Sequence, residues 1–231
     1  AILGFTQLME MNAQSKLSAI EKKNLEMISS AGNHLLELIN EVLDLSKVES
    51  GDLELSVETV DLVPIVDNVI SISKSLSDEK IVSLEYQQVP VDSCFVEADP
   101  LRLKQVVLNL ISNAIKFNKP NGSVIVSYEK QDGGMMRLGI KDTGSGISED
   151  KKDKLFKPFE RLGMQPEQIE GTGIGLTITK QLVELMNGTI GFESTAGEGS
   201  FFYVNFPVST KPQFPTQVAE RAEPVQSSST H

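Results

Sequence analysis

Hydrophobic residues between positions 99 and 118 recur at steps of three and four, which predicts a helix with one broad buried face. The positions that we expect to be buried are Leu103, Val106, Val107, Leu110, Ile111, Ala114 and Ile115. Asp99 ahead of Pro100 is typical of a helix start, because the carboxylate accepts first-turn amides and proline lacks a donor. Asn109, Asn113 and Lys116 follow steps of four and three, so they form one polar column. The column indicates either a Mg²⁺ and phosphate site or amides that cap neighbouring backbone groups.

The N-terminal part of the chain has a helical pattern. Residues 1–12 form a partly amphipathic segment, and a long helix is predicted over 18–49. Its apolar residues follow a heptad seam, widened by three further residues, as in a four-helix bundle. The seam residues are Ile28, Leu35, Val42, Ala31, Leu38 and Leu45, and the widening residues are Leu36, Ile39 and Leu43. Because two helices cannot close such a bundle, we expect a homodimer through these helices.

From residue 53 onward, strand and helix patterns alternate. We predict strands at 55–60, 81–87, 94–97, 123–130, 135–141, 189–194 and 200–206, and helices at 62–77, 99–118 and 175–187. In the first of these helices, Ile65, Val69, Ile72 and Leu76 are expected to face inward. The clustered helices and hairpins favour an α+β two-layer sandwich with a mixed, largely antiparallel sheet. The expected domains are a helical hairpin (1–52), a catalytic domain (53–208) and a linker or disordered tail (209–231).

Charge and composition exclude several classes of protein. The net charge of −11 argues against sequence-independent binding to nucleic acid and against attraction to anionic lipid. Cys94 is the single cysteine, so it forms no intramolecular disulfide, and we expect it to be a small buried strand residue. No apolar run reaches the roughly 20 residues of a membrane helix. We therefore expect a cytoplasmic segment without direct membrane contact, excised from a longer chain because it starts without Met.

Two glycine-rich segments carry candidate chemistry. Asp142, Gly144 and Gly146 follow a strand directly. The Asp142 carboxylate could accept a hydrogen bond from an exocyclic amine, and the glycines would let the backbone approach a planar ligand. The segment 171–176 opens a helix, whose free amides attract phosphate. It lacks the neighbours of a dinucleotide fold or a Walker loop. Residues 155–170 between the two segments are typical of a mobile lid, in which Phe156 and Phe159 are either lid or plain core residues.

Four motifs occur in one order: Asn-x-x-x-Asn-x-x-Lys-Phe, Asp-x-Gly-x-Gly, Phe-x-x-Phe and Gly-x-Gly-x-Gly. In this combination the sequence resembles the sensor histidine kinases of two-component signalling, within the wider group of gyrase, heat-shock chaperone and mismatch-repair ATPases. The resemblance extends from residue 1 to about 207 and includes a last glycine motif at 197–201. Residues 170–206 look most like hybrid kinases, in which a receiver domain often follows.

The resemblance implies that the chain binds ATP or ADP with Mg²⁺ and is the catalytic core that transfers a phosphoryl group from ATP to a histidine, from which it passes to a response-regulator receiver domain. It implies that Asn113 with Asn109 holds Mg²⁺, that Lys116 meets the phosphates and that Phe117 packs at the nucleotide's edge. Asp142 would accept a hydrogen bond from the adenine amine. Arg161 would be the lid cation that binds the terminal phosphate. The implied residues of the pocket floor and the phosphate loop are Gly144, Gly146, Gly171, Thr172, Gly173, Gly175 and Leu176.

One departure from the family pattern concerns the phospho-acceptor. The family's His-Glu-x-x-Thr-Pro-Leu motif lies immediately ahead of the Ile-Leu-Gly-Phe that here occupies residues 2–5, and this chain lacks it. Neither His34 nor His231 stands in its place, and we expect His34 to be a helix residue flanking the seam. The fragment is therefore not expected to autophosphorylate. The alternatives are a gyrase- or chaperone-type ATPase, which would need a Glu base where Asn109 stands, and a non-catalytic nucleotide-binding dimer scaffold.

Overall fold

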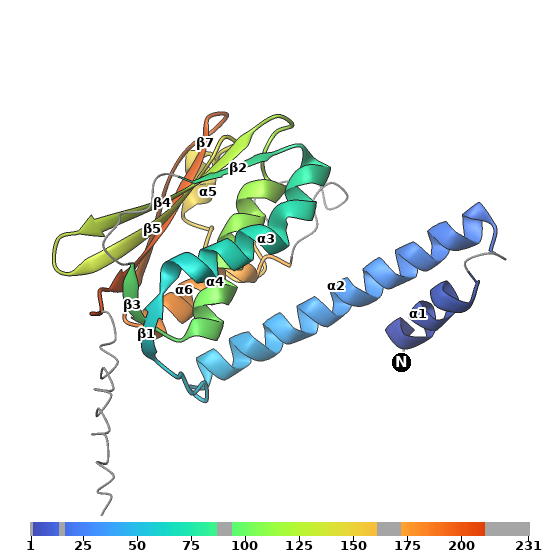
Figure 1. Ribbon diagram of the computed structural model, residues 1–231, viewed down its shortest axis with the longest axis horizontal. Helices are drawn as coiled ribbons and strands as arrows, with labels where there is room; N and C mark the ends of the chain where they lie inside the picture. The colour runs from blue at the N-terminus through green and yellow to red at the C-terminus, as the bar shows by residue number, and fades with distance from the viewer. Residues whose placement is uncertain (1, 14–16, 87–93, 161–171, 211–231) are drawn as a thin grey trace, which may run out of the picture.

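The computed structural model describes residues 2–13, 17–86, 94–160 and 172–210. Its N-terminal part is a helical hairpin of α1 (Ile2–Ala13) and α2 (Ala19–Glu49), which lie alongside each other (Figure 1). Ser18 starts α2 with a capping box, because its hydroxyl accepts from the Glu21 amide and the Glu21 carboxylate accepts from the Ser18 amide. Leu3 of α1 lies directly over Gly32 of α2, where a methyl group would be 2.8 Å from Leu3 Cδ2. The predicted hairpin is confirmed.

A five-stranded sheet forms the second part of the fold. Its strands are β2 (Ser83–Tyr86), β4 (Ser123–Gln131), β5 (Met135–Asp142), β7 (Gly199–Pro207) and β6 (Thr189–Thr195), in that order across the sheet. β2 pairs with β4 in parallel, and the other neighbours are antiparallel. The helices α3 (Leu62–Lys80), α4 (Pro100–Lys116) and α6 (Gly175–Leu185) lie between this sheet and the C-terminal half of α2 (Figure 1). The α+β class with a mixed, largely antiparallel sheet is therefore confirmed.

Helix α4 has the buried face that its sequence predicts. Its buried residues are Leu103, Val106, Val107, Leu110, Ile111, Ala114 and Ile115. Asp99 caps the helix, because its Oδ1 accepts from the Leu101 and Arg102 amides at 3.0 and 3.1 Å. The position of α4 in the middle of the helical layer brings its polar column toward the N-terminal end of α6.

Asp99 also binds the segment that links α2 to the sheet domain. Asp99 Oδ2 accepts from the Ser56 amide at 2.9 Å. β1 (Glu58–Asp61) starts only after this contact, so the predicted strand at 55–60 is wrong at its first residues. β1 pairs with β3 (Phe95–Ala98) in a separate two-stranded sheet, and Cys94 is buried directly ahead of β3. Ser209 donates its amide to the Phe95 carbonyl, so the end of the domain lies against this small sheet.

Two packing predictions need correction. In α3 the predicted inward residue Ile72 is 54% exposed, whereas Ser73 and Ser77 are buried together with Val69. Small serine side chains allow α3 to pack closely against its neighbours, and this rotates the buried face by one residue. Leu45 of α2, predicted as a seam residue for a second copy, is 8% exposed and belongs to the core of the sheet domain. The seam prediction is wrong at this position.

Two further observations complete the fold. A short helix that the sequence did not predict, α5 (Glu149–Lys152), follows the first glycine motif. Across the part of the chain that the structure describes, no helix has both the length and the apolar character needed to span a bilayer.

Candidate nucleotide site

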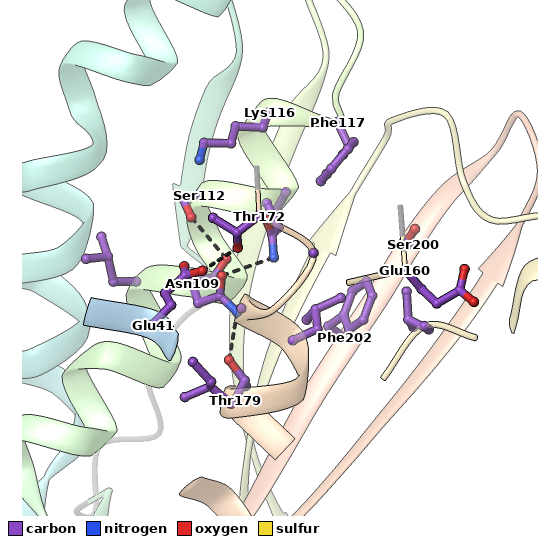
Figure 2. A pocket seen from close by; sticks show the side chains of 18 of the residues that line it. Glu41, Asn109, Ser112, Lys116, Phe117, Glu160, Thr172, Thr179, Ser200 and Phe202 are labelled. Carbon is purple, nitrogen blue, oxygen red and sulfur yellow. Dashed lines mark hydrogen bonds between the residues drawn. The ribbon is translucent and has the colours of Figure 1, made fainter. Parts of the chain in front are cut away.

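The polar column of α4 opens onto a cavity of about 870 Å³. Its walls come from α4, from the segment after β5, from the start of α6 and from α2 (Figure 2). A pocket of several hundred cubic ångströms is the size that cofactors and small ligands occupy. The elements that carry the sequence motifs therefore surround a common space.

The two asparagines of the column form a hydrogen-bonded chain across two helices. Asn109 donates its side-chain amide to Thr179 Oγ1 on α6 at 2.7 Å, and Asn113 donates to Asn109 Oδ1 at 3.3 Å (Figure 2). The Asn113 side-chain oxygen is the next acceptor in this series of hydrogen bonds, and Asn113 lines the cavity. The capping alternative for these amides is wrong, because both are bonded to side chains.

Asp142 is 6% exposed, and its carboxylate faces the cavity from the end of β5. Its Oδ1 accepts from the amides of Gly144 and Ser200 at 2.8 and 3.2 Å. Burial raises the pKa of Asp142 above its ordinary value, and the two amides offset part of that rise. Because both bonds end on Oδ1, the other oxygen is the one available to a ligand.

Glycine is required where the backbone approaches this site most closely. A methyl group on Gly175 would lie 2.7 Å from Asn109 Oδ1. Gly146 has a φ of +63°, and a methyl group there would lie 1.9 Å from the Thr195 carbonyl oxygen. These two glycines allow the start of α6 to approach α4 closely and the segment after β5 to approach the end of β6.

Most of the residues that the sequence singles out line this one cavity. They are Asn109, Asn113, Lys116, Phe117, Asp142, Gly146, Thr172, Gly173, Gly175 and Leu176. Gly144 is buried behind the wall, where a methyl group would lie 2.4 Å from the Phe117 carbonyl oxygen. Arg161 and Gly171 lie outside the described residues, as does most of the predicted lid.

The two phenylalanines at the start of the predicted lid lie in different environments. Phe156 is half-buried, with its ring 5.9 Å from the Phe192 ring in an edge-to-face arrangement. Phe159 is 64% exposed and has a φ of +64°. Phe156 therefore packs in the domain, whereas Phe159 belongs to the exposed segment that precedes residue 161.

Sequence reasoning missed that α2 forms a wall of the cavity. His34, Asn40, Glu41 and Asp44 line it, at helical spacings that place them on one side of α2. The Glu41 carboxylate accepts a hydrogen bond from the Thr172 hydroxyl in the second glycine segment (Figure 2). The polar repeat along α2 was visible in the sequence, but it does not indicate which partner surface covers it.

Contacts between α2 and α4 hold this wall in place. Asp44 Oδ2 lies 3.5 Å from the Arg102 guanidinium and accepts from the Gln105 amide at 3.0 Å. Arg102 also donates to Gln105 at 3.0 Å, so the three side chains form one polar cluster. The cluster lies one helical turn from Glu41 along α2.

Family models match both parts of the chain. The His Kinase A (phospho-acceptor) domain matches residues 1–51, and the Histidine kinase-, DNA gyrase B-, and HSP90-like ATPase matches residues 98–210. The chain belongs to the sensor histidine kinase family. These matched regions make up the catalytic core of a protein-histidine kinase, and the ATPase-type match supports ATP as the ligand of the cavity.

Individual sensor kinases are similar over nearly the whole chain. The autoinducer 2 sensor kinase/phosphatase LuxQ of Vibrio vulnificus is 34% identical over 90% of this chain and 24% of the relative. Sensor histidine kinase GacS of Pseudomonas protegens is 38% identical over 88% of this chain and 22% of the relative. The chain thus spans about a quarter of the length of these relatives.

Solved structures agree with the fold. Full-length ShkA in complex with AMPPNP superposes with a TM-score of 0.74 at 29% identity, covering 92% of this chain and 43% of that one. Acinetobacter baumannii histidine kinase AdeS gives a TM-score of 0.65 at 26% identity, covering 90% of this chain and 94% of that one.

Proposed function

We propose that this kinase core binds Mg-ATP in the described cavity and transfers the terminal phosphoryl group to a histidine, from which it passes to a receiver domain. The observation that carries the proposal is the convergence of Asp142, Asn113 and the start of α6 on one cavity. Phosphoryl transfer needs positioning and charge neutralisation more than covalent chemistry by the protein. The AMPPNP bound to ShkA, whose structure is similar to this chain, supports ATP as the nucleotide.

The adenine ring would lie at the Asp142 end of the cavity. Its amine would donate to the Asp142 oxygen that the Gly144 and Ser200 amides leave available. Gly146 and Gly144 would shape the pocket floor, because side chains at either position would collide with backbone atoms. Phe117, which is 39% exposed at the end of α4, would pack at the nucleotide's edge.

The triphosphate would lie between α4 and the start of α6. Mg²⁺ takes oxygen ligands and keeps several waters, which fits Asn113 Oδ1 as a ligand that Asn109 holds in place. Bound there, the ion would neutralise charge on the phosphates. Lys116 and the free amides at the start of α6, with Gly173, Gly175, Thr172 and Leu176, would hold the phosphate oxygens. The family resemblance adds Gly171 to that loop and Arg161 as the lid cation.

The two alternatives fit the site less well. A gyrase- or chaperone-type ATPase needs a base for the attacking water, and Asn109 is a neutral amide already bonded to Thr179 and Asn113. A dimer scaffold without catalysis would have no need for a buried carboxylate and close backbone approaches around an 870 Å³ cavity.

The N-terminal hairpin would form the homodimer, as a dimerisation domain at residues 1–52. Ile28, Leu35 and Val42 are 46%, 55% and 42% exposed, which supports a partner on this face. Residues 53–208 would be the catalytic domain and 209–231 a linker. We place the segment in the cytoplasm, where a response-regulator receiver domain would accept the phosphoryl group.

A phosphorylation assay tests this function. The chain incubated with γ-labelled ATP should gain no phosphohistidine, whereas a chain extended by His-Glu-x-x-Thr-Pro-Leu ahead of Ile2 should gain acid-labile label. Asn113→Ala in the extended chain should lose at least about 90% of that label, because the cation would lose its oxygen ligand. An extended chain that binds ATP without gaining label, or label on the unextended chain that His34→Gln removes, would contradict the proposal.

A further inference from the structure

A row of polar side chains crosses three strands of the sheet next to an apolar row on the same face. Ser194 of β6, Ser200 of β7 and Asp142 of β5 are register partners, one on each strand. The neighbouring row on this face lies two positions further along each strand, because side chains alternate between the faces. It consists of Phe192, Phe202 and Ile140. The polar row lies at the end of the sheet that borders the cavity, where Ser200 lines it beside Phe202 (Figure 2).

The Ser194 hydroxyl connects the segment after β5 with the start of β7. Its oxygen accepts from the Ile147 amide at 2.8 Å, and its proton is donated to the Gly199 carbonyl at 2.9 Å. The Ser200 hydroxyl lies 3.0 Å from the same oxygen. A hydroxyl has one proton, so Ser200 is the donor in this third contact and its hydroxyl is oriented by Ser194.

A single peptide group carries this arrangement to Asp142. The carbonyl of the peptide between Gly199 and Ser200 accepts from Ser194, and the amide of the same peptide donates to Asp142 Oδ1 at 3.2 Å. Because a trans peptide is planar, its carbonyl and its amide point in opposite directions and turn together. The hydrogen bond from Ser194 therefore fixes the direction of the amide that holds the carboxylate.

The second hydrogen bond to this carboxylate cannot replace the first. The Gly144 amide also donates to Asp142 Oδ1, but it lies only two residues further along the chain. A contact so close in sequence can move together with its own turn. The Ser200 amide is 58 residues away on a neighbouring strand, so it is the bond that ties the Asp142 side chain to the sheet.

We infer that Ser194 is a positioning residue of the nucleotide site, which holds the Gly199–Ser200 peptide so that Asp142 prefers purines with an exocyclic amine. The inference rests on the proposed function. Ser194 is not among the described residues that line the cavity, so it acts through Ser200 and Asp142 and makes no contact with the nucleotide. A site that hydrogen-bonds an amine discriminates against a ligand without one, and the discrimination depends on how firmly the acceptor is held.

Calorimetric titration with two nucleotides tests the inference. The Kd is measured in excess Mg²⁺ for ADP and for purine riboside diphosphate, which lacks the amine, and the ratio of the second Kd to the first gives the preference for the amine. The chains are the wild type, Ser194→Ala and Ser127→Ala. Ser127 of β4 is the matched control, because its hydroxyl also donates to a glycine carbonyl, that of Gly139, but on the opposite face of the sheet.

We expect the ratio to fall about three- to tenfold in Ser194→Ala and to stay within about twofold of the wild-type value in Ser127→Ala. A general loosening of the site would weaken both nucleotides equally and leave the ratio unchanged. Asp142→Asn should lower the ratio by itself. Adding Ser194→Ala to Asp142→Asn should lower it no further, because Ser194 acts through that carboxylate.

A conservative variant separates the hydroxyl from the fold. Ser194→Thr keeps the hydroxyl on a residue that strands favour, so it should keep the wild-type ratio within about twofold. An unchanged ratio in Ser194→Ala, an equal fall in Ser127→Ala, or a ratio in Ser194→Thr as low as in Ser194→Ala would overturn the inference while leaving the nucleotide site intact. A wild-type chain that binds neither nucleotide would instead overturn the proposed function.

Discussion

Asn109 on α4 and Thr179 on α6 are joined by a 2.7 Å hydrogen bond from the asparagine amide to the threonine hydroxyl. Thr179 is 2% exposed, so the bond is shielded from water. It fixes which end of the Asn109 amide points back toward Asn113. The two helices that carry the proposed cation and phosphate residues are thus connected through the asparagine itself.

Removal of that hydroxyl should weaken the binding of Mg-ATP without affecting the adenine end. In Thr179→Val, Asn109 loses its partner and the Asn113 oxygen is held less firmly, which we expect to raise the Kd for Mg-ATP about three- to tenfold. Adenosine affinity should stay within about twofold. The control is Thr177→Val, on the same helix, whose hydroxyl donates to the Phe156 carbonyl instead. Equal losses in the two variants would contradict the role of the Asn109 bond.

A methyl group at residue 175 should weaken the binding of Mg-ATP without lowering the stability of the fold. Gly175→Ala favours the helical conformation of α6 by up to about 1 kcal/mol, but its methyl group would press on Asn109 Oδ1 from 2.7 Å. We expect an unchanged or raised Tm together with a Kd for Mg-ATP at least about fivefold weaker. Gly4→Ala, in an open position of α1, is the control and should leave the Kd unchanged. A Gly175→Ala chain with wild-type affinity would show that Asn109 can move without consequence.

Asp99 should contribute stability that depends on pH. Burial acts to raise its pKa, but the amides of Ser56, Arg102 and Leu101 outweigh burial and lower the pKa below the ordinary value of 3.8. An Asp with a lowered native pKa stabilises the fold above its unfolded pKa, and this contribution disappears as the pH falls through the native pKa. Asp99→Ala should therefore cost about 2 kcal/mol at pH 7. Denaturant unfolding should show that difference shrinking well below pH 3.8, and a constant difference would contradict the assignment.

The exposed seam of α2 should mediate self-association. Leu35→Asp puts a charge at a position that is 55% exposed in one chain, and we expect it to shift the sedimentation profile from dimer toward monomer. Lys22→Asp, at an exposed polar position of the same helix, should leave the profile unchanged. A wild-type chain that stays strictly monomeric at high concentration would refute the dimer.

The sequence predicted the elements whose signals are local. The buried face of α4 and its Asp99 cap follow from spacing and capping within one helix, and both are confirmed. The outward turn of Ile72 was not predictable, because it depends on how closely α3 packs against other elements. Leu45 fits a heptad as well as any seam residue, and only the tertiary fold decides whether a second copy or the chain's own core covers it.

The same distinction applies to the site. The residues of the four motifs were found because each motif is contiguous, and most of those that the structure describes line one cavity. The exceptions are Gly144, Phe156 and Phe159. Glu41 was missed because its relationship to Thr172 exists only when α2 lies against α6. No spacing in the sequence encodes that contact.

The most direct test of the account is ADP titration of Asp142→Asn. The amide in place of the carboxylate presents a donor or a weaker acceptor to the adenine amine, so we expect ADP affinity to fall by about 1–3 kcal/mol. Because burial raises the pKa of Asp142, wild-type affinity should also start to fall at a higher pH than an ordinary Asp would give, as protonation removes the charged acceptor. Asp132→Asn, in the exposed β4–β5 turn, is the control. Calorimetry that finds the same ADP affinity in Asp142→Asn as in the wild-type chain would contradict the nucleotide site.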